Sequence, residues 1–172
     1  MPIRFVELPA GIFFCPPLHL RQKTAFICAM LPPDIHVRYV EDDEDFTAVY
    51  RIRAAVFQGE HALDEETEID GHEHISHHYL ALVDGLPVGT ARWRMTMNGK
   101  AKLERFAVLS TYRNQGVGRA LAAAILKHVP AHRPVYLEAL VNVVGFYEKL
   151  GFKTVGEPYE EAGLPHIRME RA

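Results

Sequence analysis

One glycine-rich segment has the residue types of an anion-binding turn. Gly116 and Gly118 come after the short apolar run 106–108 and before a stretch with helical periodicity. A strand that leads through glycines into a helix directs several backbone N–H groups, and the positive end of the helix dipole, toward one point. Arg113 and Arg119 flank the turn and can add charge-assisted hydrogen bonds. The segment therefore predicts a site for a phosphate group.

Three classes of phosphate ligand compete for this turn. A Walker A loop requires Gly-x-x-x-x-Gly-Lys-Ser/Thr, and the chain contains no such string. A dinucleotide fingerprint requires Gly-x-Gly-x-x-Gly, but Leu121 occupies the third glycine position. The pattern that is left, Arg-x-x-Gly-x-Gly, suits the pyrophosphate of coenzyme A. An ordinary loop at the start of a helix would also account for the two glycines.

A second group of residues could bind a metal ion. Imidazoles are common zinc ligands, and four histidines lie close together in the sequence: His72, His74, His77 and His78. No cysteine accompanies them and their spacing is not that of a zinc protease. A loop on the substrate side explains the cluster at least as well, so we expect no metal.

The elements that must position these residues alternate between strands and helices. Two hairpin signals, 84–87 and Asn98-Gly99, separate the early strands, whereas later strands are separated by helices. The pattern predicts a mixed α/β fold, with one sheet and helices on both of its faces. The expected strands are 36–40, 78–83, 88–97, 101–108, 134–140, 152–157 and 166–170, and the expected helices are about 46–57, 116–129 and 142–150, with 64–70 as a short helix or a loop.

Length and composition set limits on the class of protein. The 172 residues, 48% of them hydrophobic, suit one domain, which we place at 36–172 after a proline-interrupted N-terminal extension, 1–35. The formal charge of −3 gives no basic surface for nucleic acid.

No apolar run approaches the length of a membrane span, which is about 20 residues. Cys15 and Cys28 are too few for a disulfide framework, which predicts a cytoplasmic protein. The apolar residues of the extension make a homodimer a reasonable expectation.

The turn and a later segment together resemble the GNAT superfamily of N-acetyltransferases. The turn Arg113-Asn114-Gln115-Gly116-Val117-Gly118 is followed thirty residues later by Gly145-Phe146-Tyr147-Glu148-Lys149-Leu150-Gly151-Phe152. Further matches point to the small bacterial ElaA-like branch: Arg53 to Phe57 with Glu60, Glu68 and Asp70, then His78, Asp84 to Arg92, and Glu161 to His166. The resemblance covers about residues 36–171. It departs from the family at Leu140 and Val143, where Gln and Ala are usual, and at His61, where Gln is usual.

The resemblance implies a twisted mixed sheet of six to seven strands whose fourth and fifth strands, 101–108 and 134–140, splay apart to admit acetyl-CoA. Backbone groups of Phe106, Ala107 and Val108 would pair with the pantetheine arm. The turn would hold the pyrophosphate through Arg113, Asn114, Gln115, Gly116, Val117, Gly118 and Arg119. Asn142 would bond the coenzyme or cap the following helix, and capping is the preferred interpretation.

The resemblance also implies direct transfer of an acetyl group from acetyl-CoA to a primary amine of a small molecule or peptide, in a ternary complex. Tyr147 matches the usual general acid of the family. Glu104 is the first candidate for the general base, and the other candidates are Glu66, Glu68, Asp70, His78 and Glu138. Attack by an amine deprotonated in solution is a further option. The departures from the family keep open a non-catalytic acyl-CoA-binding or partner-binding module, and a nucleotide-binding turn is a weaker third interpretation.

Overall fold

The computed structural model describes residues 33–60 and 69–171. The predicted extension, 1–35, therefore lies outside the described residues except for its last three positions, and so does the segment 61–68. Both cysteines fall outside as well, together with Glu66 and Glu68. None of the helices in the described part of the chain is long and apolar enough to cross a membrane.

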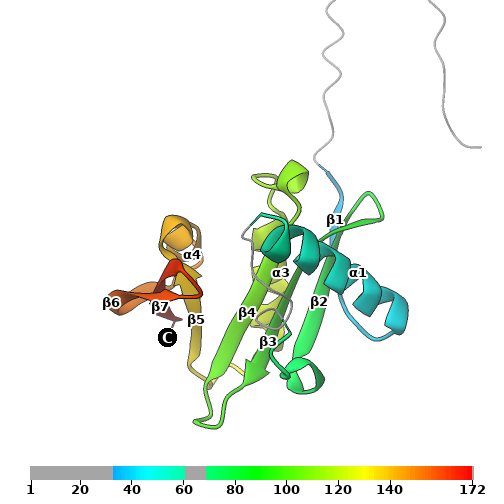
Figure 1. Ribbon diagram of the computed structural model, residues 1–172. Helices are drawn as coiled ribbons and strands as arrows, with labels where there is room; N and C mark the ends of the chain where they lie inside the picture. The colour runs from blue at the N-terminus through cyan, green and yellow to red at the C-terminus, as the bar shows by residue number, and fades with distance from the viewer. Residues whose placement is uncertain (1–32, 61–68, 172) are drawn as a thin grey trace, which may run out of the picture. The chain divides into compact units, whose positions relative to one another are not determined.

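Seven strands form one mixed sheet (Figure 1). Their spatial order is β1-β2-β3-β4-β5-β7-β6, and every neighbouring pair is antiparallel except β4 and β5, which are parallel. The predicted mixed α/β fold is confirmed. The strands are β1 Ile35–Tyr39, β2 His77–Val83, β3 Leu86–Met95, β4 Ala101–Val108, β5 Val135–Leu140, β6 Lys153–Glu161 and β7 Leu164–Arg171.

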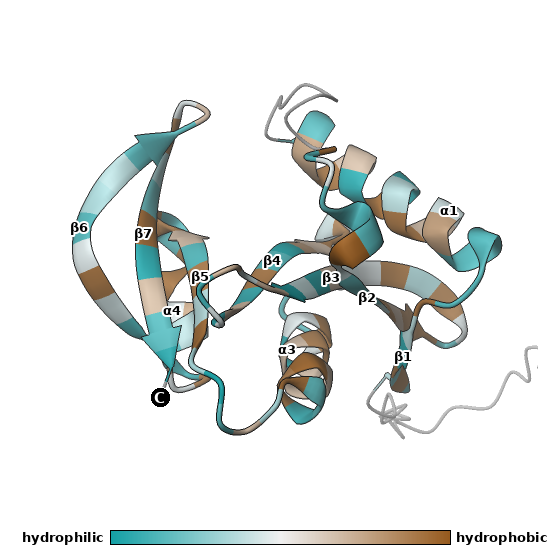
Figure 2. Cartoon of the chain, turned by 90° about the horizontal axis from the view of Figure 1, so that it is seen from below, coloured by the Kyte–Doolittle hydropathy of each residue, from teal (hydrophilic) through white to brown (hydrophobic). Residues whose placement is uncertain are grey.

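Helices cover both faces of the sheet, as Figure 2 shows for α1 and α3. Helix α1, Asp43–Arg53, begins at Asp42, whose carboxylate caps the amide of Asp45, and continues into a π-helical turn at Ala54–Gln58. Helix α3, Val117–His128, joins β4 to β5, and the short α4, Val144–Glu148, follows β5. Single 3₁₀ turns occur at Glu73–Ile75, Ser110–Tyr112 and Val141–Val143.

Alternation along the strands builds a separate apolar layer under each helix. On β2, Tyr79 and Ala81 belong to the larger core with α3, while Leu80 belongs to the smaller core with α1. The α3 layer includes Leu121 and Ile125, which are fully buried. Because successive side chains point to opposite faces, each strand residue near the site can be assigned to the α1 face or the α3 face.

The structure corrects three local predictions. Asn142 lies in a 3₁₀ turn, and Val143 holds the N-cap position of α4 without a side-chain cap, so the capping prediction for Asn142 was wrong. The first hairpin turn consists of Asp84 and Gly85 alone, both with positive φ, and β3 starts at Leu86. Strand β6 runs past its expected end because a register shift between Val155 and Tyr159 lets it continue beyond Gly156.

Candidate active site

The parallel strands β4 and β5 pair over only three residues each. Ala101, Lys102 and Leu103 pair with Val135, Tyr136 and Leu137, and the ladder between these two strands ends there. Both strands continue, to Val108 and Leu140, and their ribbons diverge in Figure 1. The segment 104–108 therefore presents its backbone edge toward β5 without pairing with it. Phe106, Ala107 and Val108, predicted to bind pantetheine, all lie on this unpaired edge.

A bulge in β4 coincides with the point of separation. Thr90 pairs with Ala107 and Arg92 pairs with Glu104, so β4 has one more residue than β3 over this stretch. Arg105 takes up the extra residue with a φ of 55°, in the left-handed region that non-glycine residues rarely adopt. Bulges turn side chains away from the regular pleat and are over-represented beside active sites. Glu104 and Phe106 thus lie on opposite faces of the sheet on either side of the bulge.

The predicted phosphate turn has the expected backbone shape. Gly116, with a φ of 96°, is the N-cap of α3, and Asn114 also has a positive φ of 62°. The first hydrogen bond of the helix runs from the Ala120 amide to the Gly116 carbonyl, at 2.9 Å. The amides of Val117, Gly118 and Arg119 therefore precede the helical ladder and can serve an anion together with the helix dipole.

Two side chains brace this turn from outside. The Arg113 Nε donates to the Val108 carbonyl at 2.9 Å, and its Nη2 donates to Glu60 at 2.7 Å. The Gln115 Nε2 donates to the Thr111 carbonyl at 2.8 Å. In this conformation both side chains hold the loop in place, whereas the side chain of Arg119 is exposed.

Tyr147, in the helix α4 that follows β5, is fixed among aromatic rings. Its ring centroid lies 4.8 Å from Phe146, 5.9 Å from Phe106 and 6.1 Å from Phe152, each in an edge-to-face arrangement. Burial raises the pKa of the Tyr147 hydroxyl. The phenol is therefore protonated at neutral pH and can act as a proton donor. Gly118 in α3 approaches Phe146, which links the phosphate turn to the element that carries the tyrosine.

Glu104 belongs to a buried cluster of charged residues on the α1 face. Its carboxylate accepts hydrogen bonds from Arg92 at 2.8 Å and Arg94 at 3.2 Å, and Lys102 Nζ lies 3.0 Å away. Burial alone would raise the pKa of Glu104, but Lys102 and Arg92 outweigh it and hold the pKa below its usual value. A carboxylate in these surroundings is a weak base, so its environment suits a fixed anion better than a proton acceptor.

Arg92 is the centre of that cluster and is 1% exposed. Besides Glu104 it bonds Glu73 at 2.9 Å and Asp70, whose pKa is lowered mainly because this guanidinium outweighs the effect of burial. Arg53, equally buried, donates to Glu73 at 3.0 Å. Sequence reasoning had noted the two arginines only as family matches. The signal that could have found them is an arginine inside an apolar run of a strand, since such a residue requires buried anions.

Two histidines of the cluster lie on opposite faces of β2, whereas His72 is the N-cap of the 3₁₀ turn that precedes it and His74 lies within that turn. His77 stacks on Trp93 with ring centroids 4.5 Å apart, whereas His78 is buried and its Nε2 donates to the Glu73 carbonyl at 3.2 Å. Burial lowers the pKa of His78. Within residues 33–60 and 69–171, no three His, Cys, Asp or Glu side chains are arranged to hold a metal ion.

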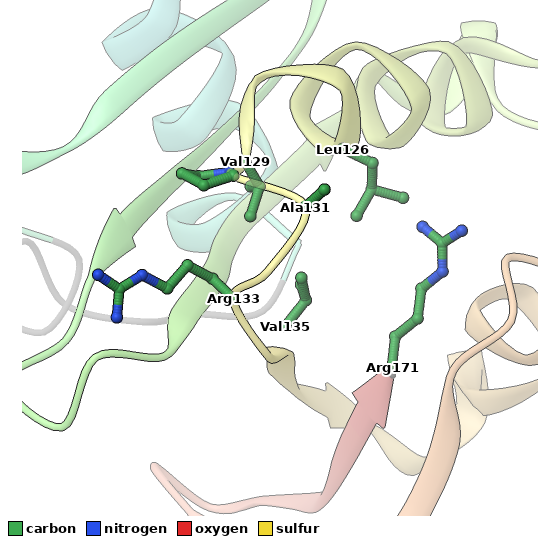
Figure 3. A pocket seen from close by; sticks show the side chains of 7 residues that line it. Leu126, Val129, Ala131, Arg133, Val135 and Arg171 are labelled. Atoms are coloured by element: carbon green, nitrogen blue, oxygen red, sulfur yellow. The ribbon is translucent and has the colours of Figure 1, made fainter.

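A surface recess lies away from these groups (Figure 3). It is formed where α3 ends and β5 begins, at the opposite end of α3 from Gly116, and has a volume of about 190 Å³. Leu126, Val129 and Val135 form its apolar part, and Figure 3 shows Arg133 and Arg171 extending on either side. It contains none of the predicted site residues.

Comparisons with known proteins agree with this geometry. Residues 41–172 match the family model described as an acetyltransferase (GNAT) domain. The N-acetyltransferase YjcF of Bacillus subtilis, described as uncharacterized, is 34% identical over 132 residues, which cover 75% of this chain and 94% of YjcF. The Escherichia coli protein ElaA is 40% identical over 70 residues, covering 39% of this chain and 46% of ElaA.

Solved structures extend the same similarity to the fold. An acyl-CoA N-acyltransferase from Pseudomonas aeruginosa superimposes with a TM-score of 0.71 at 28% identity, covering 81% of this chain and 99% of that one. The crystal structure of E. coli ElaA gives the same four values. The resemblance to the ElaA-like branch is confirmed. The parallel pair β4–β5 with its early split, the turn at the start of α3 and the family match over residues 41–172 together show that the chain belongs to the GNAT acetyltransferase family.

Proposed function

We propose that this protein transfers an acetyl group from acetyl-CoA to a primary amine of a small molecule or peptide, by direct transfer in a ternary complex. The observation that carries the proposal is the split between β4 and β5, with the phosphate turn at one side and Tyr147 at the other. Family membership supports an acyl-CoA as the acyl donor.

The residues present fit coenzyme A. An unpaired strand edge, 104–108, suits a ligand such as the pantetheine arm, which carries its own amide groups and can pair with a backbone. The amides of Val117, Gly118 and Arg119 suit a pyrophosphate. Gly116 keeps that approach clear, because it has no side chain and adopts a φ of 96°. When bound, acetyl-CoA supplies a thioester carbonyl, at which the C–N bond forms and the C–S bond breaks.

The chain's own residues would position the reaction and supply a proton. We assign Tyr147 the role of proton donor to the departing sulfur, since burial raises the pKa of its hydroxyl. Asn142, exposed in the turn after β5, is the proposed side-chain contact to the coenzyme. Glu104 stays a candidate for the general base, although its three cationic partners favour an amine that loses its proton to another group or to solvent.

The test is a screen of amines with acetyl-CoA, in which release of the CoA thiol is followed with DTNB. Release that depends on the amine supports acetyl transfer. Coenzyme binding without thiol release across amino acids, diamines, aminoglycosides and peptides would favour the non-catalytic acyl-CoA-binding module. Competition by ATP or NAD against CoA would favour a nucleotide at the turn. The expected cytoplasmic location and a homodimer remain predictions.

A further inference from the structure

Two carboxylates lie on either side of the split at its first unpaired position. Leu103 and Leu137 are the last residues paired between β4 and β5, and both belong to the core on the α3 face. Side chains alternate along a strand, so the next residues, Glu104 and Glu138, both lie on the opposite face. Glu138, whose side chain is 19% exposed against 7% for Glu104, is the member of the pair that an acceptor approaching from the α1 face can contact.

The two carboxylates differ in how far their charge is compensated. Glu104 contacts three cationic side chains within 3.2 Å. Glu138 lies 3.6 Å from Arg168, which is too long for a hydrogen bond, and this guanidinium donates instead to Glu170 at 3.1 Å. A carboxylate can accept about four hydrogen bonds, and among the described residues Tyr159 alone donates one to Glu138. Glu138 therefore keeps capacity for a cationic ligand.

The β6–β7 hairpin holds Glu138 in position. The Tyr159 hydroxyl donates to Glu138 at 2.7 Å, and the Tyr159 ring stacks near His166 with centroids 6.1 Å apart. The register shift in β6, where Gly156 has a φ of 77°, sets the position of Tyr159 on the strand. Burial and the bond to Glu138 raise the pKa of the Tyr159 hydroxyl, so it stays a donor. The same strand carries three further carboxylates and no cation after its first residue: Glu157, Glu160 and Glu161.

The chemistry of acyl transfer determines which nitrogen of an acceptor Glu138 can bind. The attacking nitrogen must be uncharged, and a neighbouring carboxylate would raise the pKa of an ammonium group and keep it protonated. Glu138 is therefore poorly suited to the reacting nitrogen and well suited to a second, permanent cation on the same molecule. The carboxylates of β6 add to the negative electrostatic potential around Glu138, which favours a cationic ligand.

We propose that Glu138, positioned by Tyr159, binds a second ammonium group of the acceptor, so that the substrate is a diamine. The inference rests on the proposed acetyltransferase function and specifies its acceptor class. Glu138 is the residue that determines specificity, and Tyr159 acts through it as a positioning residue.

The experiment compares 1,4-diaminobutane with n-pentylamine, which matches it in length but lacks the second cation. The readouts are kcat/KM from thiol release and the dissociation constant of each amine by titration calorimetry with CoA present. We expect the wild type to prefer the diamine by about 10- to 100-fold, the range of one hydrogen bond to a charged group. Glu138→Gln, which keeps the shape of the side chain, should remove this preference in both readouts by weakening the diamine far more than n-pentylamine.

Two variants separate the site from general effects of charge. Tyr159→Phe should raise the KM for the diamine more than the KM for n-pentylamine. Glu160→Gln, which removes a carboxylate from the same strand without touching Glu138, should keep most of the preference. Equal use of both amines by the wild type, or a preference that survives in Glu138→Gln, would overturn the inference. Turnover of other amines but not of the diamine would also overturn it while leaving the acetyltransferase function intact. Failure of every amine would refute both proposals.

Discussion

Replacement of Arg92 by methionine tests whether the buried charge cluster holds the acceptor side of the sheet together. The guanidinium is 1% exposed and bonds three carboxylates, Asp70, Glu73 and Glu104. Methionine fills most of the space of the arginine stem but leaves these anions without their shared cation. Breaking a buried ion pair by removing one partner costs about 3–5 kcal/mol of the free energy of unfolding.

The structure favours the lower end of that range. Each carboxylate keeps another cation, since Glu104 still contacts Lys102, Glu73 still contacts Arg53 and Asp70 still lies 3.2 Å from Arg105. We therefore expect a loss of about 3 kcal/mol. For a chain of this size each kcal/mol lowers Tm by about 2–4 °C, so the expected drop is about 6–12 °C.

Urea and thermal unfolding at pH 7 measure both quantities. The matched control is Lys100→Met, because both side chains of the Lys100–Glu170 pair reach solvent, being 33% and 36% exposed. Surface pairs of that kind contribute about 0–1 kcal/mol. The difference between Arg92→Met and the wild type should shrink as pH falls and Asp70 and Glu104 become protonated. A loss no larger than that of Lys100→Met would refute the assignment of Arg92 as the centre of the cluster.

Three further predictions concern the site and the sheet. Tyr147→Phe should lower kcat by about 10²- to 10⁴-fold and leave the dissociation constant of CoA nearly unchanged, and equal losses in both would indicate a purely structural tyrosine. Gly89→Ala should cost about 1–3 kcal/mol in urea unfolding, because the added Cβ would lie 2.9 Å from the Val117 Cγ1, whereas Gly145→Ala, with open space around it, should cost nothing. The pKa values of Asp70 and Glu104 are lowered by folding, so their stabilisation is complete above their ordinary values, near pH 4, and is lost as pH falls through the folded values. The urea midpoint should therefore decrease on acidification below about pH 5, and a midpoint that stays constant down to pH 3 would contradict this sign.

The fold was largely predictable because its signals are local. The predicted ranges overlap all seven strands, and the predicted bounds 101–108 coincide with β4. The glycine turn was predictable for the same reason. A residue with positive φ at the start of a helix is usually glycine, so the sequence itself marks the turn. The capping prediction for Asn142 failed because it assumed that the helix begins at this residue. The chain instead forms a 3₁₀ turn at Asn142 before the helix starts.

The charge cluster could not be predicted from local patterns. Arg53, Glu73, Arg92 and Glu104 come from four separate elements, and only the strand register brings them together. Glu138 was one of several equivalent candidates in the sequence. Its distinction comes from the end of the β4–β5 ladder at Leu137 and from a hydroxyl 21 residues further along the chain. Contacts between residues this far apart in the chain produce no periodic pattern in the sequence.

Titration calorimetry of the full chain with acetyl-CoA tests the central claim most directly. An unpaired strand edge beside a helix N-terminus should bind one acetyl-CoA per chain with saturable heat, and excess ATP should not displace it. Absence of binding at millimolar acetyl-CoA would contradict the assignment of the β4–β5 split as an acyl-CoA site.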